Sequence, residues 1–176
     1  CIRDSNMTAS EQVDAVMAEL PGLLTRWESI FKSIEGKLDT LGVHRARIDS
    51  LTPEERTFVT RYFQAYVSPV ISPLVIDPRH PFPNLRNGAL YLACGLDGVT
   101  DEESLLGLIE FPTSMNRVVE IPSPTGTYSY ILLEDVILAC LDSCFGSYKP
   151  LDRALIRVTR NADIDPDGEG VEEEED

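Results

Sequence analysis

A stretch rich in proline yet apolar, residues 62–87, constrains the fold of this chain more than any other segment. It contains five of the twelve prolines in the sequence. Proline fixes φ and removes a backbone hydrogen-bond donor, so the stretch is incompatible with a helix interior or a central strand. Flexible linkers are polar, whereas most residues between these prolines are apolar. The sequence therefore predicts an ordered connection that packs on a hydrophobic core.

A long helix is predicted before this connection. Its apolar residues recur at alternating spacings of four and three, as at the a and d positions of a heptad repeat. Thr8 and Glu11 form a capping box at its start, Gly42 ends it, and Pro21 is expected to kink or split it. The stripe is either the seam of a coiled-coil-like dimer or a face that packs on its own domain or on the second helix. Its members are Val13, Met17, Leu20, Leu24, Trp27, Phe31, Ile34, Leu38 and Leu41.

The second helix has clear start and stop signals. Thr52 is its N-cap, Pro53 occupies the first helical position, and Glu55 completes a capping box. The helix is expected to end near Ser68, because Pro69 disfavours a helical conformation at the preceding residue. Its aromatic and aliphatic stripe is interpreted as core.

Beyond residue 88 the hydrophobic period changes from 3.6 to 2, which predicts strands. The connections between the first four strands are too short for helical crossovers, so antiparallel neighbours are expected. Two helices followed by strands with one inserted helix predict an α+β fold with a mainly antiparallel sheet. The predicted strands span residues 89–96, 105–111, 117–121, 127–132 and 153–159, and the inserted helix spans residues 133–145.

The net charge of −15 is concentrated at one end of the sequence. Residues 163–176 carry nine acidic groups and no basic one. We therefore expect one domain over residues 1–162 and an acidic, disordered tail over residues 163–176. An acidic chain does not attract nucleic acid at long range, so no such partner is expected. No run of about 18 apolar residues occurs, and insertion into a membrane is not expected.

Motifs that carry chemistry are few. Residues 163–174 match the calcium-loop pattern of EF-hands, but a predicted strand precedes them and Pro166 stiffens the loop, so a calcium sensor is disfavoured. The four cysteines form no CxxC pair and are expected to be reduced and buried. Neither His44 nor His80 lies in a recognisable base–nucleophile pattern, and no GxxxxGK[ST] loop occurs. No catalytic or metal-binding residue is predicted in this chain.

Four blocks of sequence carry a resemblance to a known family. The first is YFQAYVSPVISPLVIDPRHPFPNLRN at residues 62–87. It is followed by FPTSMNRVVEIP at residues 111–122, LLEDVI at 132–137 and IRVTRNAD at 156–163. In this order and spacing, the four blocks resemble the middle (head) domain of polyphosphate kinase. The resemblance covers roughly residues 51–165, and the first fifty residues match only in helical character.

This resemblance implies a phosphotransferase that moves the terminal phosphate of ATP reversibly to polyphosphate through a phosphohistidine. Mg²⁺ and ATP are implied for the whole enzyme, which would be a cytoplasmic, ATP-binding phosphoprotein; peripheral membrane association is left open. In the family the phosphorylated histidine lies in C-terminal domains. This segment is therefore expected to be an inactive scaffold that contacts the other domains of the polypeptide and contributes to a homo-oligomer. The alternative is a stand-alone interaction module that dimerises through residues 13–41.

Arg157 and Arg160 are the candidate phosphate contacts. Guanidinium groups bind phosphate oxygens in a fork geometry, and polyphosphate must thread through an enzyme of this family. In the last predicted strand, Ala154, Ile156 and Val158 share the face predicted to be buried, and Arg157 lies on the other. The alternative is that Arg157 and Arg160 pair with Asp or Glu inside this acidic domain.

Overall fold

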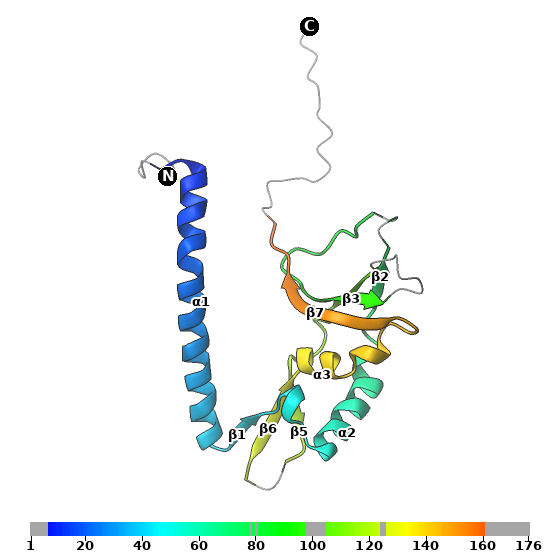
Figure 1. Ribbon diagram of the computed structural model, residues 1–176. Coiled ribbons are helices and arrows are strands. Elements are labelled where there is room, and N and C mark those ends of the chain that lie inside the picture. The colour runs from blue at the N-terminus through cyan, green and yellow to red at the C-terminus, as the bar shows by residue number, and fades with distance from the viewer. Residues whose placement is uncertain (1–6, 78, 80, 98–104, 124–125, 161–176) are drawn as a thin grey trace. The chain divides into compact units, whose positions relative to one another are not determined.

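The computed structural model describes residues 7–77, 79, 81–97, 105–123 and 126–160 (Figure 1). The chain forms two compact units. One contains Cys1–Arg47 with Glu120–Ile131, and the other contains Ile48–Val119 with Leu132–Asp176. The chain crosses from one unit to the other after Arg47, between Val119 and Glu120, and between Ile131 and Leu132.

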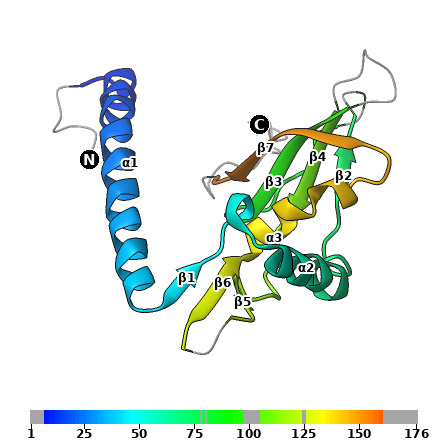
Figure 2. The ribbon, with the colours of Figure 1, turned by 60° about the horizontal axis from the view of Figure 1, so that its bottom comes forward.

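The elements follow the predicted order of helices and strands, which confirms the α+β class. Strands β1, β6 and β5 form one sheet, and β2, β4, β3 and β7 form another (Figure 2). Among the described helices, none combines the length and apolar character needed to cross a bilayer. In chain order the helices and strands are α1 (Ala9–Thr40), β1 (Val43–Arg45), α2 (Pro53–Tyr62), β2 (Leu74–Ile76), β3 (Leu90–Asp97), β4 (Leu105–Glu110), β5 (Val118–Ile121), β6 (Tyr128–Leu132), α3 (Leu133–Ala139) and β7 (Lys149–Arg157).

Helix α1 runs without a break for 32 residues. The predicted capping box of Thr8 and Glu11 is present at its start. The expected split at Pro21 is wrong: the residue lies inside the helix, and the Thr25 hydroxyl donates to the Pro21 carbonyl at 2.9 Å. Proline removes one backbone donor, and a helix this long retains its other hydrogen bonds on both sides.

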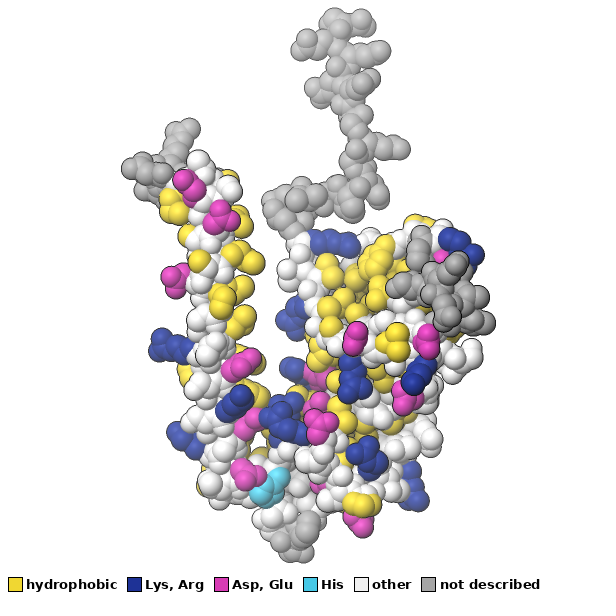
Figure 3. Space-filling view, in the orientation of Figure 1, with side chains coloured by type: hydrophobic (Ala, Val, Ile, Leu, Met, Phe, Trp, Pro, Cys, Tyr) yellow, Lys and Arg dark blue, Asp and Glu magenta, His cyan; other side chains and the backbone are white. Residues whose placement is uncertain are grey.

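Most of the apolar stripe of α1 is exposed within the unit that contains it, Leu38 is half-buried, and no residue of this helix is buried. Trp27 is 60% exposed and stacks on Phe31, with ring centroids 5.5 Å apart. Packing of this stripe on its own domain or on α2, and its alternative role as a dimer seam, both stay predictions. Figure 3 shows hydrophobic side chains at the surface along the length of the helix.

Strand β3 lies at the centre of the four-stranded sheet, antiparallel to both β4 and β7. One face of this sheet carries a cluster of Leu85, Tyr91 and Leu108, against which Ile156 and Val158 pack. Leu85 comes from the connection rich in proline, so one anchor of this segment reaches the core as predicted. Other apolar residues of the connection, including Val70, Leu74, Val75 and Phe82, are exposed.

Helices α2 and α3 supply further core residues of the same unit. The predicted capping box of Thr52 and Glu55, with Pro53 inside it, begins α2. A π-helical turn, Phe63–Val67, continues the helix to the predicted end near Ser68. Helix α3 stops at Ala139, six residues before the expected end, and a short 3₁₀ turn follows it. The buried residues of these helices are Val59, Phe63, Val67, Leu133, Glu134, Val136 and Ile137.

Several strand predictions need correction. The two three-residue strands β1 and β2 were not expected, because three residues are too few to show alternation. Strand β1, which contains His44, pairs in parallel with β6. Strands β4 and β5 belong to different sheets and are not neighbours. Ala154, predicted to be buried, is exposed, because the cluster of Leu85, Tyr91 and Leu108 packs against Ile156 and Val158 and not against Ala154.

We expect Gly107→Ala to destabilise the fold. A Cβ atom at this position of β4 would lie 2.7 Å from Cζ of Phe145 and 2.8 Å from Sγ of Cys94. Overpacking of this kind lowers the free energy of unfolding by about 1–3 kcal/mol, which urea denaturation measures. Gly95→Ala is the matched control on β3, since its nearest atom would be Cβ of Leu151 at 3.9 Å. Equal losses in both variants would contradict this account of the packing.

Candidate functional site

The turn at Asn87 and Gly88 is tied to the end of β7. Gly88 has a φ of 73°, a left-handed conformation that glycine adopts without steric cost. Its N–H donates to the Val158 carbonyl at 2.8 Å, and the Arg160 N–H donates to Oδ1 of Asn87 at 2.9 Å. The second bond joins segments that lie 73 residues apart in the sequence. The turn therefore fixes the start of β3 against the end of the last strand.

A cavity of about 270 Å³ opens beside this turn, within the unit that contains the four-stranded sheet. Three guanidinium groups and one carboxylate line it, so its local charge is positive although the chain is acidic. An apolar wall completes it. Residues of the lining include Arg86, Arg117, Arg157, Glu134, Phe111 and Met115. We call it the arginine cavity.

Arg117 and Glu134 form an ion pair in the arginine cavity. Nε of Arg117 donates to Oε1 of Glu134, and the Arg117 carbonyl accepts the N–H of Leu133 at 2.8 Å. The Glu134 side chain is 4% exposed, whereas that of Arg117 is 68% exposed. The arginine thus neutralises a buried carboxylate in the first turn of α3 while most of its own surface contacts solvent.

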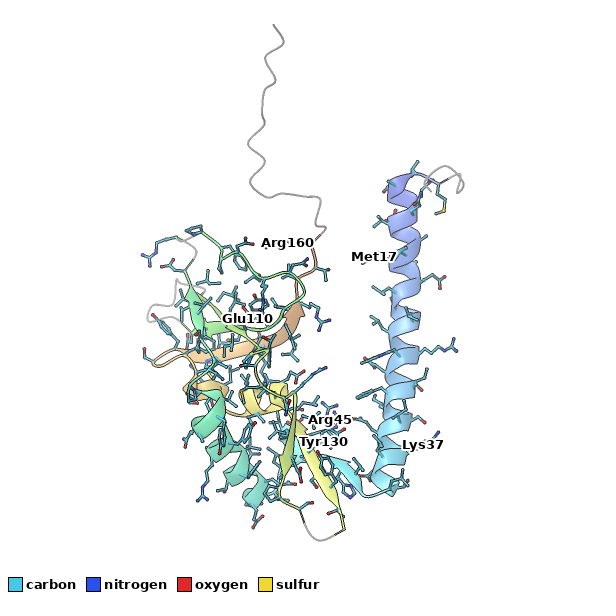
Figure 4. The ribbon with its side chains drawn as sticks, turned by 180° about the vertical axis from the view of Figure 1, so that it is seen from behind. Met17, Lys37, Arg45, Glu110, Tyr130 and Arg160 are labelled. Carbon is cyan, nitrogen blue, oxygen red and sulfur yellow. The ribbon has the colours of Figure 1, made fainter. Side chains whose placement is uncertain are left out.

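Arg86 is held by a second acidic residue. Its Nη2 pairs with Oε1 of Glu110, and its backbone N–H donates to the Tyr91 hydroxyl at 2.8 Å. That hydroxyl donates to Oε2 of Glu110 at 3.0 Å. Tyr91 therefore links the backbone of Arg86 to its ionic partner. Figure 4 labels Glu110 on the four-stranded sheet, together with Arg160 beyond the end of β7.

The two arginines singled out in the sequence have different surroundings. Arg157 ends β7, is exposed and lines the arginine cavity. Arg160 lies outside the residues that line the cavity, and its Nη1 donates to Oδ1 of Asn84. Over residues 7–77, 79, 81–97, 105–123 and 126–160, neither arginine forms an ion pair with Asp or Glu. Phosphate contact by Arg157 and Arg160 stays a prediction.

A smaller cavity, of about 210 Å³, lies in the other unit, between α1, β1 and β6. The Glu35 carboxylate accepts hydrogen bonds from two arginines that line this cavity. Nη1 of Arg45 donates to its Oε1 at 3.0 Å, and Nη2 of Arg47 donates to its Oε2 at 2.6 Å. Both oxygens of this carboxylate are thus engaged by arginines. In the backbone pairing of β1 with β6, Arg45 lies opposite Tyr130 (Figure 4). The cavity is interpreted as a structural ion-pair cluster.

The remaining candidates do not assemble a reactive centre among the described residues. Nδ1 of His44 contacts Oδ1 of Asp39 at the surface of the first unit. His80 and the calcium-loop pattern lie outside the described residues. Burial raises the pKa of the Cys94 and Cys140 thiols. Burial, together with the neighbouring thiols and Asp142, raises the pKa of Cys144 to about 12, so these thiols do not supply a nucleophilic thiolate at neutral pH.

Sequence reasoning missed Arg86, Arg117 and Glu134 as members of one site. A signal for Glu134 exists, since it is an acidic residue inside the apolar run ILLEDVI, where a strand leads directly into a helix. A charged residue in such a run is buried only when it is paired. Its partner could not be identified, because the contact depends on the tertiary path between β5 and α3.

The fold and the arginine cavity define an α+β domain that presents arginines beside the edge of a sheet. The model of the family described as "Polyphosphate kinase middle domain" matches residues 54–175. The chain therefore belongs to the polyphosphate kinase middle-domain family.

Individual relatives agree with this assignment. A polyphosphate kinase of Bacillus anthracis is 33% identical over 172 residues, which cover 95% of this chain and 24% of the relative. A polyphosphate kinase of Pseudomonas putida is 36% identical over 126 residues, covering 69% of this chain and 17% of the relative. The crystal structure of polyphosphate kinase from Porphyromonas gingivalis matches with a TM-score of 0.70 and 26% identity, covering 90% of this chain and 26% of that one. The matched region thus spans between 17% and 26% of the length of these relatives.

We expect Arg117→Met to lower the free energy of unfolding by about 1–2 kcal/mol. The substitution leaves a buried carboxylate without its donor, and the exposure of Arg117 to solvent keeps the loss small. Arg153→Met on β7 is the matched control, since Arg153 is exposed and does not line the cavity. Its effect should stay within about 0.5 kcal/mol in the same urea titration. A loss no larger than that of the control would show that the pair does not stabilise the fold.

Proposed function

We propose that this chain is a non-catalytic part of a polyphosphate kinase, an enzyme that transfers the terminal phosphate of ATP reversibly to polyphosphate through a phosphohistidine. In this proposal the chain is a scaffold for the other domains of the polypeptide, and its arginine cavity lies where polyphosphate passes. Arg157 contacts the phosphate chain there, and Arg160, which follows β7, is the second phosphate contact. Membership of the family and the positive charge of the cavity support this proposal.

The cofactors and location of the whole enzyme follow from the same proposal. Mg²⁺ and ATP bind the other domains, and the phosphorylated histidine belongs to them as well. Phosphoryl transfer needs an in-line nucleophile, a metal ion to bridge phosphate oxygens and cations to hold the developing charge. The arginine cavity offers only the last of these. The enzyme is proposed to be cytoplasmic.

Helix α1 supports a second role, in assembly. Its exposed apolar residues include Val16, Leu23 and Ile30 in addition to the a/d stripe. Three apolar positions per heptad make a wider face than the two-position seam of a coiled coil. We propose that the rest of the polypeptide covers part of this face and that a second copy contributes to the remainder. A stand-alone dimerisation module is the alternative, and the exposed face favours it as the second candidate.

The isolated chain should associate with itself through α1, since the other domains are absent. Sedimentation velocity over a dilution series should show a monomer–dimer equilibrium that shifts to monomer on dilution. Trp27→Ala should weaken it at least about tenfold, because large aromatic side chains dominate such contacts. Lys32→Ala is the control, because residue 32 lies outside the apolar face. A chain that stays monomeric at every concentration would contradict the assembly role.

We also expect the isolated chain to be catalytically inert. When the purified chain is incubated with labelled ATP and Mg²⁺, it should form no polyphosphate and no acid-labile phosphohistidine, because no nucleophile is predicted in it. The decisive observation against this proposal would be label retained on His44 or His80 and lost on substitution of that histidine by alanine.

A further inference from the structure

The arginine cavity contains a buried polar atom without a partner. Oε1 of Glu134 accepts a hydrogen bond from Arg117, but Oε2, which is also buried, has no hydrogen-bond partner among the described residues. The residue is 3% exposed and lines the cavity. Buried polar groups in native proteins are almost always satisfied, so an unpaired carboxylate oxygen indicates a missing donor.

None of the nearby protein donors reaches Oε2 of Glu134 in the described part of the chain. Arg86 pairs with Glu110, and Nε of Arg117 is used by Oε1 of Glu134. Arg157 lines the cavity as a cation without an ion-pair partner in the described part of the chain. A ligand for this site must therefore be anionic overall, to match the guanidinium groups. It must also carry a hydrogen-bond donor, to satisfy Oε2.

We propose that the arginine cavity binds a singly protonated phosphate group. Its unprotonated oxygens accept hydrogen bonds from Arg157 and Arg117, and its P–OH donates to Oε2 of Glu134. A phosphate monoester carries a charge of about −1.5 to −2 at pH 7, so part of the population holds one proton. Inorganic phosphate and the end of a polyphosphate chain share this chemistry. The interior phosphates of a chain carry no such proton, so the cavity recognises chain ends.

Other ligands fit the same residues poorly. A metal cation would meet three guanidinium groups, and sulfate would direct an unprotonated oxygen at a buried carboxylate, a repulsive arrangement. A phosphodiester backbone, like the interior of polyphosphate, offers no P–OH. The volume of about 270 Å³ suits one phosphate group with accompanying water, given that a water occupies about 30 Å³ in the liquid. The assignment of a chain end as the source rests on the proposed function, whereas recognition of protonated phosphate does not.

The test is calorimetric titration of the full chain with four anions: inorganic phosphate, sulfate, linear tripolyphosphate and cyclic trimetaphosphate. The first and third contain a terminal phosphate that holds a proton, and the other two do not. We expect sulfate to bind about tenfold to a hundredfold more weakly than phosphate, and trimetaphosphate similarly more weakly than tripolyphosphate, because each leaves a buried charged oxygen unpaired. Equal affinities within both pairs, or no binding of phosphate, would overturn the inference and leave Oε2 as the site of an ordered water.

Variants separate the two parts of the site. Glu134→Gln keeps the shape and presents an amide donor, so phosphate and sulfate should bind with equal affinity; unchanged selectivity would contradict the role of Oε2. Arg157→Gln should weaken both anions, whereas Arg153→Gln, the matched change on the same strand, should weaken neither. Thermal melting confirms that each variant is folded, and the comparison of anions on the unaltered chain decides the question if Glu134→Gln does not fold.

The outcomes distinguish this inference from the proposed function. Discrimination between phosphate and sulfate without any binding of tripolyphosphate would support a site for inorganic phosphate and would contradict contact with polyphosphate. Binding of tripolyphosphate and trimetaphosphate with equal affinity would preserve contact with polyphosphate and would overturn recognition of chain ends.

Discussion

The pairing of β3 with two antiparallel neighbours is the constraint on which the site depends. Strand β3 holds β4 on one side and β7 on the other, and the turn before it is hydrogen-bonded to the residues that follow β7. Because a glycine with positive φ permits this turn, Arg86 and Arg157 reach one cavity although they lie far apart in the sequence. The arginines are therefore positioned by backbone hydrogen bonds of a rigid sheet and not by flexible loops alone.

Electrostatics gives this cavity a character opposite to that of the whole chain. With a net charge of −15, long-range forces repel phosphate compounds, so any contact must be local. Arg117 and Arg86 are partly neutralised by Glu134 and Glu110, whereas Arg157 has no such partner in the described part of the chain. The two ion pairs hold the side chains of Arg86 and Arg117 in place, and the guanidinium group of Arg157 provides the attraction for an anion. Other domains of the enzyme are proposed to supply the remaining positive charge.

The sequence predicted elements with strong local signals and failed where tertiary contacts decide. The capping boxes at Thr8 and Thr52, the α+β class and the family followed from local patterns. The short strands β1 and β2 depend on partners elsewhere in the chain, so periodicity could not reveal them. Arg157 was selected from its residue type and strand position alone. Arg117 and Glu134 are separated by 17 positions in the sequence, with β5 and β6 between them, so no local pattern predicts their contact.

The most direct test of a phosphate site in this domain is NMR of the arginine side chains. The Nε–Hε signals of Arg157 and Arg117 are predicted to shift together when tripolyphosphate is added, with one common midpoint, because both line the same cavity. The signal of Arg153, which is exposed on the same strand, is predicted to stay in place. Uniform small shifts of all three arginines would indicate unspecific attraction of the anion to surface charge and would contradict a phosphate site in the arginine cavity.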